Sequence, residues 1–132
     1  MSQHAFNPPG RIPASPMYSH GAVAGGLIFT AGIVAIDEKG QTQHVGDAGA
    51  QTHHILATIG DILAARNASF DDVLMVHVYL KTMDDYAAMN AVYADVFPAP
   101  RPARFCVAAG LVKDDWLVEI AVVAQAKGME PA

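Results

Sequence analysis

Apolar and small polar residues alternate in two short runs near the start of the chain, a pattern typical of β-strands. The runs are "YSHGAV" and "LIFTAGIV", and they flank Gly25 and Gly26. Consecutive glycines between such runs are typical of a tight turn, because glycine readily adopts a positive φ. The pattern therefore predicts a β-hairpin. Residues 1–16, which precede it, are rich in proline and predict an extended arm.

The stretch from Ala48 to Arg66 has the spacing of an amphipathic helix. Its large apolar residues recur every three or four positions, which places them on one face of a helix. They are Ile55, Leu56, Ile59, Ile62 and Leu63. Asp47 fits an N-cap, and Asn67 fits a left-handed stop at the other end.

A second helix is expected between Thr82 and Pro98. Thr82 followed by Asp85 resembles a capping box, with Asp in place of the usual Glu. Proline cannot continue a helix, so the helix should end before Pro98. One side of this helix carries a set of aromatic and apolar residues. They are Tyr86, Met89, Tyr93 and Val96.

Three further strands complete the pattern, at residues 73–80, about 103–109 and about 116–126. The order is then β-β-α-β-α-β-β. This order predicts an α+β fold in which one sheet has two helices on one face. With 132 residues and no linker or repeat, residues 1–132 are expected to form one domain.

Alternation along the predicted strands sorts their side chains into two faces. One aliphatic face is expected to pack under the helices. It comprises Leu74, Val76, Val78 and Leu80, with Val118, Ile120 and Val122 from the last strand. On this assumption Arg104, Cys106 and Glu119 share the opposite face.

That opposite face is too apolar to remain in contact with water. It carries Met75, Tyr79, Leu117, Ala121 and Val123. Large exposed apolar patches usually mark interaction surfaces, and both predicted helices are already used on the other side. We therefore expect identical subunits to cover it in a homo-oligomer.

Charge and cysteine content exclude several classes of protein. The formal net charge is −5, and no cluster of Lys and Arg provides a nucleic-acid-binding surface. Cys106 is the only cysteine, which fits a reducing compartment. The N-terminus does not resemble a signal peptide, and no apolar run is long enough to span a bilayer. We expect a soluble, cytoplasmic protein that binds neither nucleic acid nor membranes.

Arg104 and Glu119 are charged residues within otherwise apolar strands. Such residues are seldom fully buried unless they are paired or have a function. One interpretation is a buried ion pair that fixes strand register. The other is a site for a small anionic ligand, in which arginine binds a carboxylate and the glutamate holds water. The residues themselves leave both interpretations open.

Other polar residues give weaker signals. Cys106 has no neighbouring base to activate its thiol. His53 and His54 are adjacent on a helix and point about 100° apart, so they make a poor metal chelate. Asn90 lies on the same helix face as Tyr86 and Tyr93, and we expect its amide to bond local backbone.

Six motifs together resemble the RidA/YjgF family of reactive-intermediate deaminases. They are "YSHG", "FTAG", "AQTHHILATI", "NAVYADVF", "PARFCV" and "VEIAVVA". The match runs from Tyr18 to Ala126, and "RPARFCVAAGLVKDDWLVEIA" is similar to the RutC branch. The resemblance implies a chorismate-mutase-like fold with a mixed, mainly antiparallel sheet. It also implies a homotrimer with sites between subunits, and hydrolysis of enamines and imines without a metal or organic cofactor.

The resemblance also assigns site residues. It implies that Arg104 binds the substrate carboxylate and that Glu119 holds the attacking water. The backbone at Cys106 and at Ala31-Gly32 would complete the pocket, and Tyr18 would form a wall. At Ala31, and also at His20 and Ile33, this chain differs from many relatives, so the size and polarity of the substrate stay open.

Several functions remain compatible with this resemblance. The RutC branch implies 3-aminoacrylate, formed in pyrimidine breakdown, as the substrate. A general deaminase of 2-aminoacrylate or 2-imino acids is the first alternative. The second is a trimer without this activity, either a ligand-binding or chaperone-like protein or one of the family members labelled as endoribonucleases.

Overall fold

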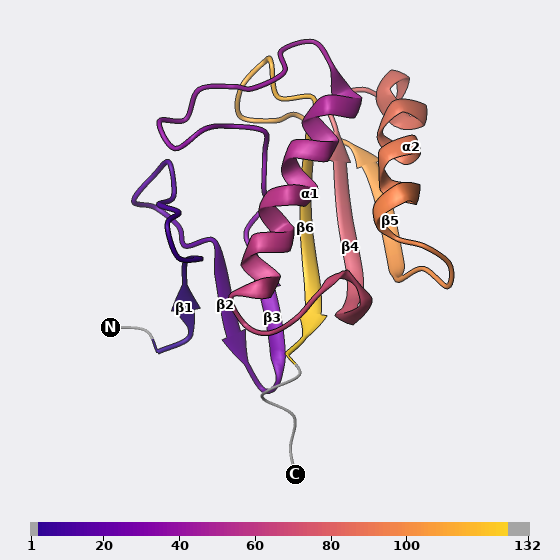
Figure 1. Ribbon diagram of the computed structural model, residues 1–132. Coiled ribbons are helices and arrows are strands. Elements are labelled where there is room, and N and C mark those ends of the chain that lie inside the picture. Colours follow the sequence, from indigo (N-terminus) through magenta and orange to yellow (C-terminus); the bar gives the residue numbers. More distant parts are fainter. Residues whose placement is uncertain (1–2, 127–132) are drawn as a thin grey trace.

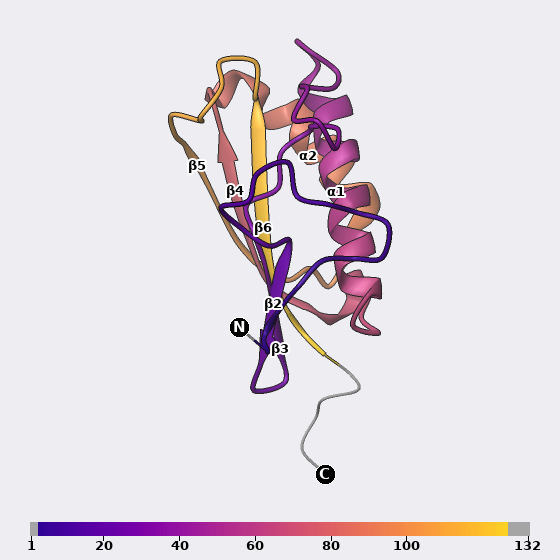
Figure 2. The same ribbon diagram turned by 90° about the vertical axis from the view of Figure 1, so that its left-hand side faces the viewer.

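The computed structural model describes residues 3–126, which form a six-stranded sheet with two helices on one face (Figure 1, Figure 2). The strand order is β1-β2-β3-β6-β4-β5. Only β4 and β5 pair in parallel, and every other neighbouring pair is antiparallel. The elements are β1 (Ala5–Phe6), β2 (Gly21–Ala24), β3 (Leu27–Thr30), α1 (Ala48–Ala64), β4 (Val73–Leu80), α2 (Tyr86–Val96), β5 (Ala103–Ala108) and β6 (Val118–Gln125).

The predicted α+β class and the order of the main elements are confirmed. The hairpin turns at Gly25 and Gly26, whose φ values of 60° and 77° suit glycine. The extended arm contains one strand that the sequence did not predict, β1, which pairs with β2. This pairing depends on Gly21, because a Cβ at that position would lie 2.7 Å from the Phe6 ring.

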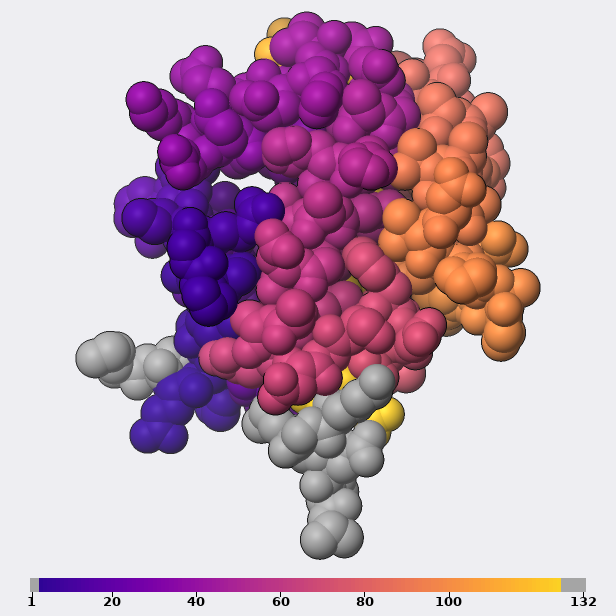
Figure 3. All heavy atoms as spheres, viewed as in Figure 1, coloured from indigo at the N-terminus to yellow at the C-terminus, as the bar shows by residue number. Residues whose placement is uncertain are grey.

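Helix α1 forms as its sequence predicts. The Asp47 side chain accepts a hydrogen bond from the backbone N–H of Ala50 and caps the helix. Asn67 adopts a φ of 58° just beyond the end. The five apolar residues predicted to face the sheet are all buried. In the space-filling view the atoms of α1 cover most of β6, and α2 lies beside them (Figure 3).

The start of α2 differs from the expected capping box. The Thr82 hydroxyl accepts a hydrogen bond from Asp84, but these residues open a short 3-10 turn, Met83–Asp85. Helix α2 then begins at Tyr86 and ends at Val96, before Pro98 as predicted. A complete capping box forms instead between Ser69 and Asp72, ahead of β4.

The prediction that Leu74 faces the helices is wrong. Val73 pairs with Ala124 and Met75 pairs with Val123, so a β-bulge lies between them at Leu74. The bulge turns Val73 into the core and leaves Leu74 49% exposed. Strict alternation holds only from Met75 onwards, which is why the pattern failed at this position.

In the described part of the chain both helices lie on one face of the sheet, and the opposite face is left open (Figure 2). Phe29, Phe105 and Val107 are each more than 40% exposed. Neither helix of the described residues has the length and apolar character needed to cross a bilayer.

Candidate active site

Arg104 lies on the edge strand β5 and is held by side chains of α2. One terminal nitrogen, Nη1, donates to Asn90 Oδ1 at 2.6 Å, and Nη2 donates to the Tyr86 hydroxyl at 3.1 Å. The guanidinium carbon lies 4.6 Å from the centre of the Tyr93 ring. The Asn90 amide therefore bonds Arg104 and not local backbone, contrary to the sequence-based expectation.

The Arg104 guanidinium keeps donors available for a ligand. It has five N–H groups, and the two hydrogen bonds to α2 use two of them. The ion pairs found within residues 3–126 join Arg11 to Asp61 and Lys81 to Asp114, so Arg104 has no carboxylate partner there. Its charge is not neutralised within the described chain.

The prediction that Arg104, Cys106 and Glu119 share a face is wrong. Residues directly opposite each other in a sheet point to the same side. Arg104 is opposite the buried Val76, and Cys106 is opposite the buried Val78. Both side chains therefore lie on the helix side. β5 is an edge strand, and the helices cover it only partly. The pattern of apolar residues along β5 therefore does not show which of its faces turns toward the helices.

Glu119 lies on the open face, directly opposite Tyr79. Burial raises the pKa of its carboxyl group above the ordinary value. No hydrogen bond or ion pair to another described residue stabilises the charged form. A half-buried carboxylate without a partner is able to accept a proton from a bound water molecule.

Gly32 brings the backbone close to the Glu119 carboxyl group. A Cβ at Gly32 would collide with Oε2 of Glu119 and would lie 3.0 Å from Cδ. The next residue, Ile33, exchanges two backbone hydrogen bonds with Ile120. The segment Ala31-Gly32, predicted to complete the pocket, is thus adjacent to Glu119.

Thr30 shapes this segment, and the sequence analysis did not identify it. Its hydroxyl accepts a hydrogen bond from the backbone N–H of Val122 and donates one to the carbonyl of Ala31. Regular pairing of β3 with β6 ends at Phe29 and resumes at Ile33. The hydroxyl therefore replaces a backbone acceptor where residues 30–32 bulge away from β6.

Cys106 is half-buried and packs against the core. Burial raises the pKa of its thiol, although the charge of Arg104 opposes this effect. The sulfur therefore stays protonated and is a weak nucleophile. Within residues 3–126 no group of three or more His, Cys, Asp and Glu side chains is arranged to hold a metal ion.

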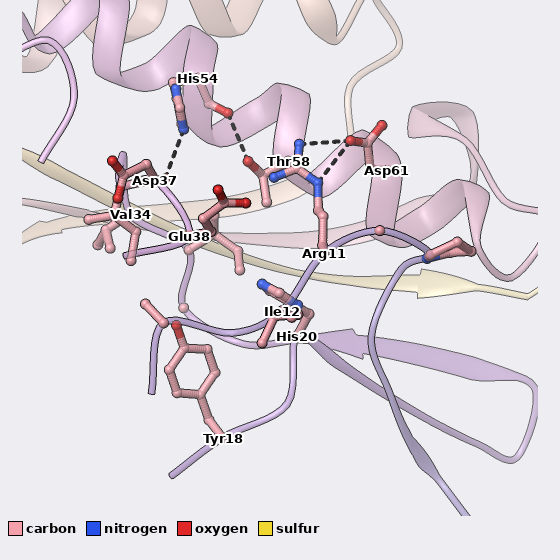
Figure 4. Close-up of a pocket in the computed structure, with 16 residues that line it drawn as sticks. Arg11, Ile12, Tyr18, His20, Val34, Asp37, Glu38, His54, Thr58 and Asp61 are labelled. Atoms are coloured by element: carbon pink, nitrogen blue, oxygen red, sulfur yellow. Dashed lines mark hydrogen bonds and ion pairs between the residues drawn. The ribbon is translucent and has the colours of Figure 1, made fainter. Parts of the chain in front are cut away.

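Tyr18 lines a pocket of about 570 Å³ between the N-terminal arm, the segment after β3, and α1. In Figure 4, Tyr18 and His20 lie on the side of this pocket opposite His54, Thr58 and Asp61 of α1. Gly32 also lines it. Arg104 lines a different pocket, together with Asn90, Tyr93 and Arg101.

Asn7 fixes the orientation of the His20 ring. Asn7 Oδ1 accepts hydrogen bonds from both the backbone N–H and the Nδ1 of His20, so Nδ1 carries the ring proton. Burial, and to a smaller extent the charge of Arg11, lower the pKa of the imidazole. A lowered pKa favours the neutral ring, in which Nε2 accepts a hydrogen bond, and His20 lines the larger pocket.

The expected site residues thus form two separate groups within one chain. Arg104 and Cys106 lie on β5 against α2, whereas Tyr18, the segment Ala31-Gly32 and Glu119 lie around β3 and β6. Arg104 is opposite Val76, which is opposite Val122. Two strand spacings and three residues along β6 put the Cα atoms of Arg104 and Glu119 roughly 14 Å apart. The two side chains also point to opposite faces, so they do not meet within the chain.

The sequence model of the endoribonuclease L-PSP family matches residues 9–126. A protein named 3-aminoacrylate deaminase RutC, from Acinetobacter baylyi, is 44% identical over 124 residues, covering 94% of this chain and 98% of that protein. The structure of the yeast protein YEO7 has a TM-score of 0.84 at 26% identity, with 93% and 98% of the two chains covered. A member of the YjgF protein family from Neisseria meningitidis has a TM-score of 0.75 at 38% identity, with 86% and 90% covered. On this evidence the chain belongs to the endoribonuclease L-PSP family, also called the RidA/YjgF family.

Proposed function

We propose that the protein is a deaminase that hydrolyses a small enamine or imine carrying a carboxylate. The observation that carries this proposal is the Arg104 guanidinium, which among residues 3–126 has three N–H groups without a partner and no neutralising carboxylate. Two of these groups suffice for the parallel hydrogen bonds that arginine makes to a carboxylate. The name of the Acinetobacter baylyi relative, 3-aminoacrylate deaminase, supports the same substrate class.

We further propose that neighbouring subunits of a homotrimer complete each site. The separation of Arg104 from Glu119 within the chain supports this arrangement, since neither group reaches the other. One subunit would supply Arg104 and the backbone at Cys106. The next would supply Glu119 with the segment Ala31-Gly32 and Tyr18. The exposed apolar residues of the open sheet face fit burial in such an assembly.

The mechanism requires only proton transfers and one water molecule. With 3-aminoacrylate, Arg104 binds the carboxylate, and a proton added to the carbon next to it converts the enamine to an iminium ion. Water attacks the iminium carbon while Glu119 accepts one of its protons. The hydroxyl proton of the resulting carbinolamine then moves to nitrogen, the C–N bond breaks as the C=O bond forms, and ammonia leaves. The other product is malonic semialdehyde.

Two alternatives remain for the substrate and the activity. A general deaminase of 2-aminoacrylate or other 2-imino acids would use the same residues. Which of these substrates fits depends on Ala31, Ile33 and His20, the positions at which this chain differs from many relatives. Binding without turnover, or the RNA cleavage in the family's endoribonuclease name, would be a different activity. The net charge of −5 disfavours an RNA-binding surface. A role in pyrimidine breakdown and a cytoplasmic location belong to the same proposal.

Release of ammonia tests the proposal directly. Aminoacrylates would be generated in the assay by a coupled enzyme, with the chain added at catalytic concentration. We expect release faster than the spontaneous hydrolysis, and its near-complete loss in Arg104→Lys, because lysine keeps the charge but lacks the planar pair of donors. A rate equal to the spontaneous one for both 2- and 3-aminoacrylate would exclude this deaminase activity.

A further inference from the structure

We infer that helix α2 fixes the direction of the Arg104 guanidinium and that Tyr86 is a positioning residue for carboxylate binding. This inference rests on the role of Arg104 in the proposed function. It adds a residue outside the predicted site, and it assigns to α2 a task beyond covering the sheet.

The three contacts to Arg104 come from one face of α2. Tyr86, Asn90 and Tyr93 are spaced at i, i+4 and i+7, so they lie in a row along the helix. The Tyr86 hydroxyl and Asn90 Oδ1 bond different terminal nitrogens of the guanidinium. The guanidinium carbon lies over the Tyr93 ring, 4.6 Å from the centre of that ring.

These contacts fix both the plane and the rotation of the guanidinium. A ring contact alone limits its tilt but leaves it free to turn, and one hydrogen bond alone allows it to pivot. Two hydrogen bonds to different nitrogens remove the pivot. An arginine side chain otherwise samples many rotamers, and holding it in one geometry has an entropic cost at the moment a ligand binds.

The chemistry of the acceptors explains why this arrangement suits an anion site. Asn90 and Tyr86 accept hydrogen bonds as neutral groups, whereas Asp or Glu at either position would cancel the charge of Arg104. Within the residues that the structure describes, the guanidinium is therefore oriented without being neutralised, and three of its N–H groups remain for a carboxylate. Arg101, which lines the same pocket, adds positive charge and no acceptor.

A double-mutant cycle with the full-length protein separates positioning from a general structural role. Propionate, a three-carbon carboxylate, would be titrated by NMR against wild type, Tyr86→Phe, Arg104→Lys and the double variant. We expect Tyr86→Phe to weaken binding about five- to tenfold, the effect of one hydrogen bond. In the Arg104→Lys background the same change should have no further effect, because Tyr86 acts through the planar guanidinium.

Controls make each outcome decisive. Propionamide, which has the same shape without the charge, should bind weakly to all four proteins. Thermal unfolding should be unchanged in Tyr86→Phe, since Tyr86 is 39% exposed. In turnover, KM should rise by the same factor while kcat stays within about twofold. Equal losses of propionate affinity in both backgrounds, or no propionate binding by wild type, would overturn the inference.

Failure of the positioning inference and failure of the proposed function give different results. Propionate binding needs no chemistry, so a coupled cycle in a protein that releases no ammonia would support positioning and reject deamination. A wild type that deaminates aminoacrylate, with additive losses in the cycle, would reject positioning alone.

Discussion

Arg104 and Glu119 lie on opposite faces of the same sheet, Arg104 opposite Val76 on the helix side and Glu119 opposite Tyr79 on the open side. This relationship removes a buried ion pair within the chain as the reason for keeping both charges. It leaves two incomplete groups of polar residues, each with unused hydrogen-bonding capacity. The proposed function therefore makes a specific demand on the assembly: a second subunit would have to complete each site.

Complementation between two inactive variants tests this demand. Arg104→Lys and Glu119→Gln should each have little activity as purified proteins. When equal amounts are refolded together, about one quarter of the sites should combine wild-type Arg104 from one subunit with wild-type Glu119 from the next. Ammonia release should recover to about that fraction of the wild-type rate. If one chain supplied both residues, the mixture would stay as inactive as its components.

The pH dependence of turnover should report the environment of Glu119. Burial raises the pKa of this carboxyl group, so its proton-accepting form appears only above the ordinary range for glutamate, about 4.3. We therefore expect kcat/KM to fall as the pH is lowered, with the midpoint of the fall above that ordinary value. Glu119→Gln should be slow at every pH and should lack this fall. The spontaneous hydrolysis rate must be subtracted at each pH.

The helices and most strands could be predicted because they depend on local features of the sequence, such as capping residues and the period of buried side chains. Asp47 and Asn67 mark the ends of α1, and the buried side chains of α1 follow the helical period. Leu74 and β1 were not predictable in this way. The bulge at Leu74 arises from pairing with β6, and β1 forms because Phe6 fits over Gly21, a contact between distant residues.

The candidate site residues could be named from the sequence, but their arrangement in space could not be predicted. The sequence pattern marked Arg104 and Glu119 as unusual charges, but the prediction that they share one face was wrong. The error arose because β5 is an edge strand, where side-chain alternation does not reveal which face the helices cover. Tyr86 had a readable signal, its i, i+4 spacing to Asn90, but only the structure shows that both side chains meet Arg104.

The Tyr93 hydroxyl gives a prediction about stability. It is buried, and it has no hydrogen-bond partner in the described part of the chain. A buried hydroxyl without a partner is destabilising, so Tyr93→Phe should raise the free energy of unfolding by about 1 kcal/mol. Chemical denaturation at fixed protein concentration measures this change. A lower stability would mean that the hydroxyl has a partner in the assembly.

Gly32 provides the most direct test of how the backbone positions Glu119. Adding a methyl group at Gly32 places a carbon where the Glu119 carboxyl group lies, so the carboxyl group must move. Because it is the end of a flexible side chain, the fold should tolerate the change, and the thermal unfolding midpoint should shift by only about 2 °C. A misplaced base is far more costly to catalysis, and kcat should fall between about 10- and 100-fold. Gly110→Ala is the matched control, since nothing lies within 4 Å of its added carbon. Turnover of Gly32→Ala at the rate of Gly110→Ala would show that the approach of Gly32 to Glu119 has no part in the reaction.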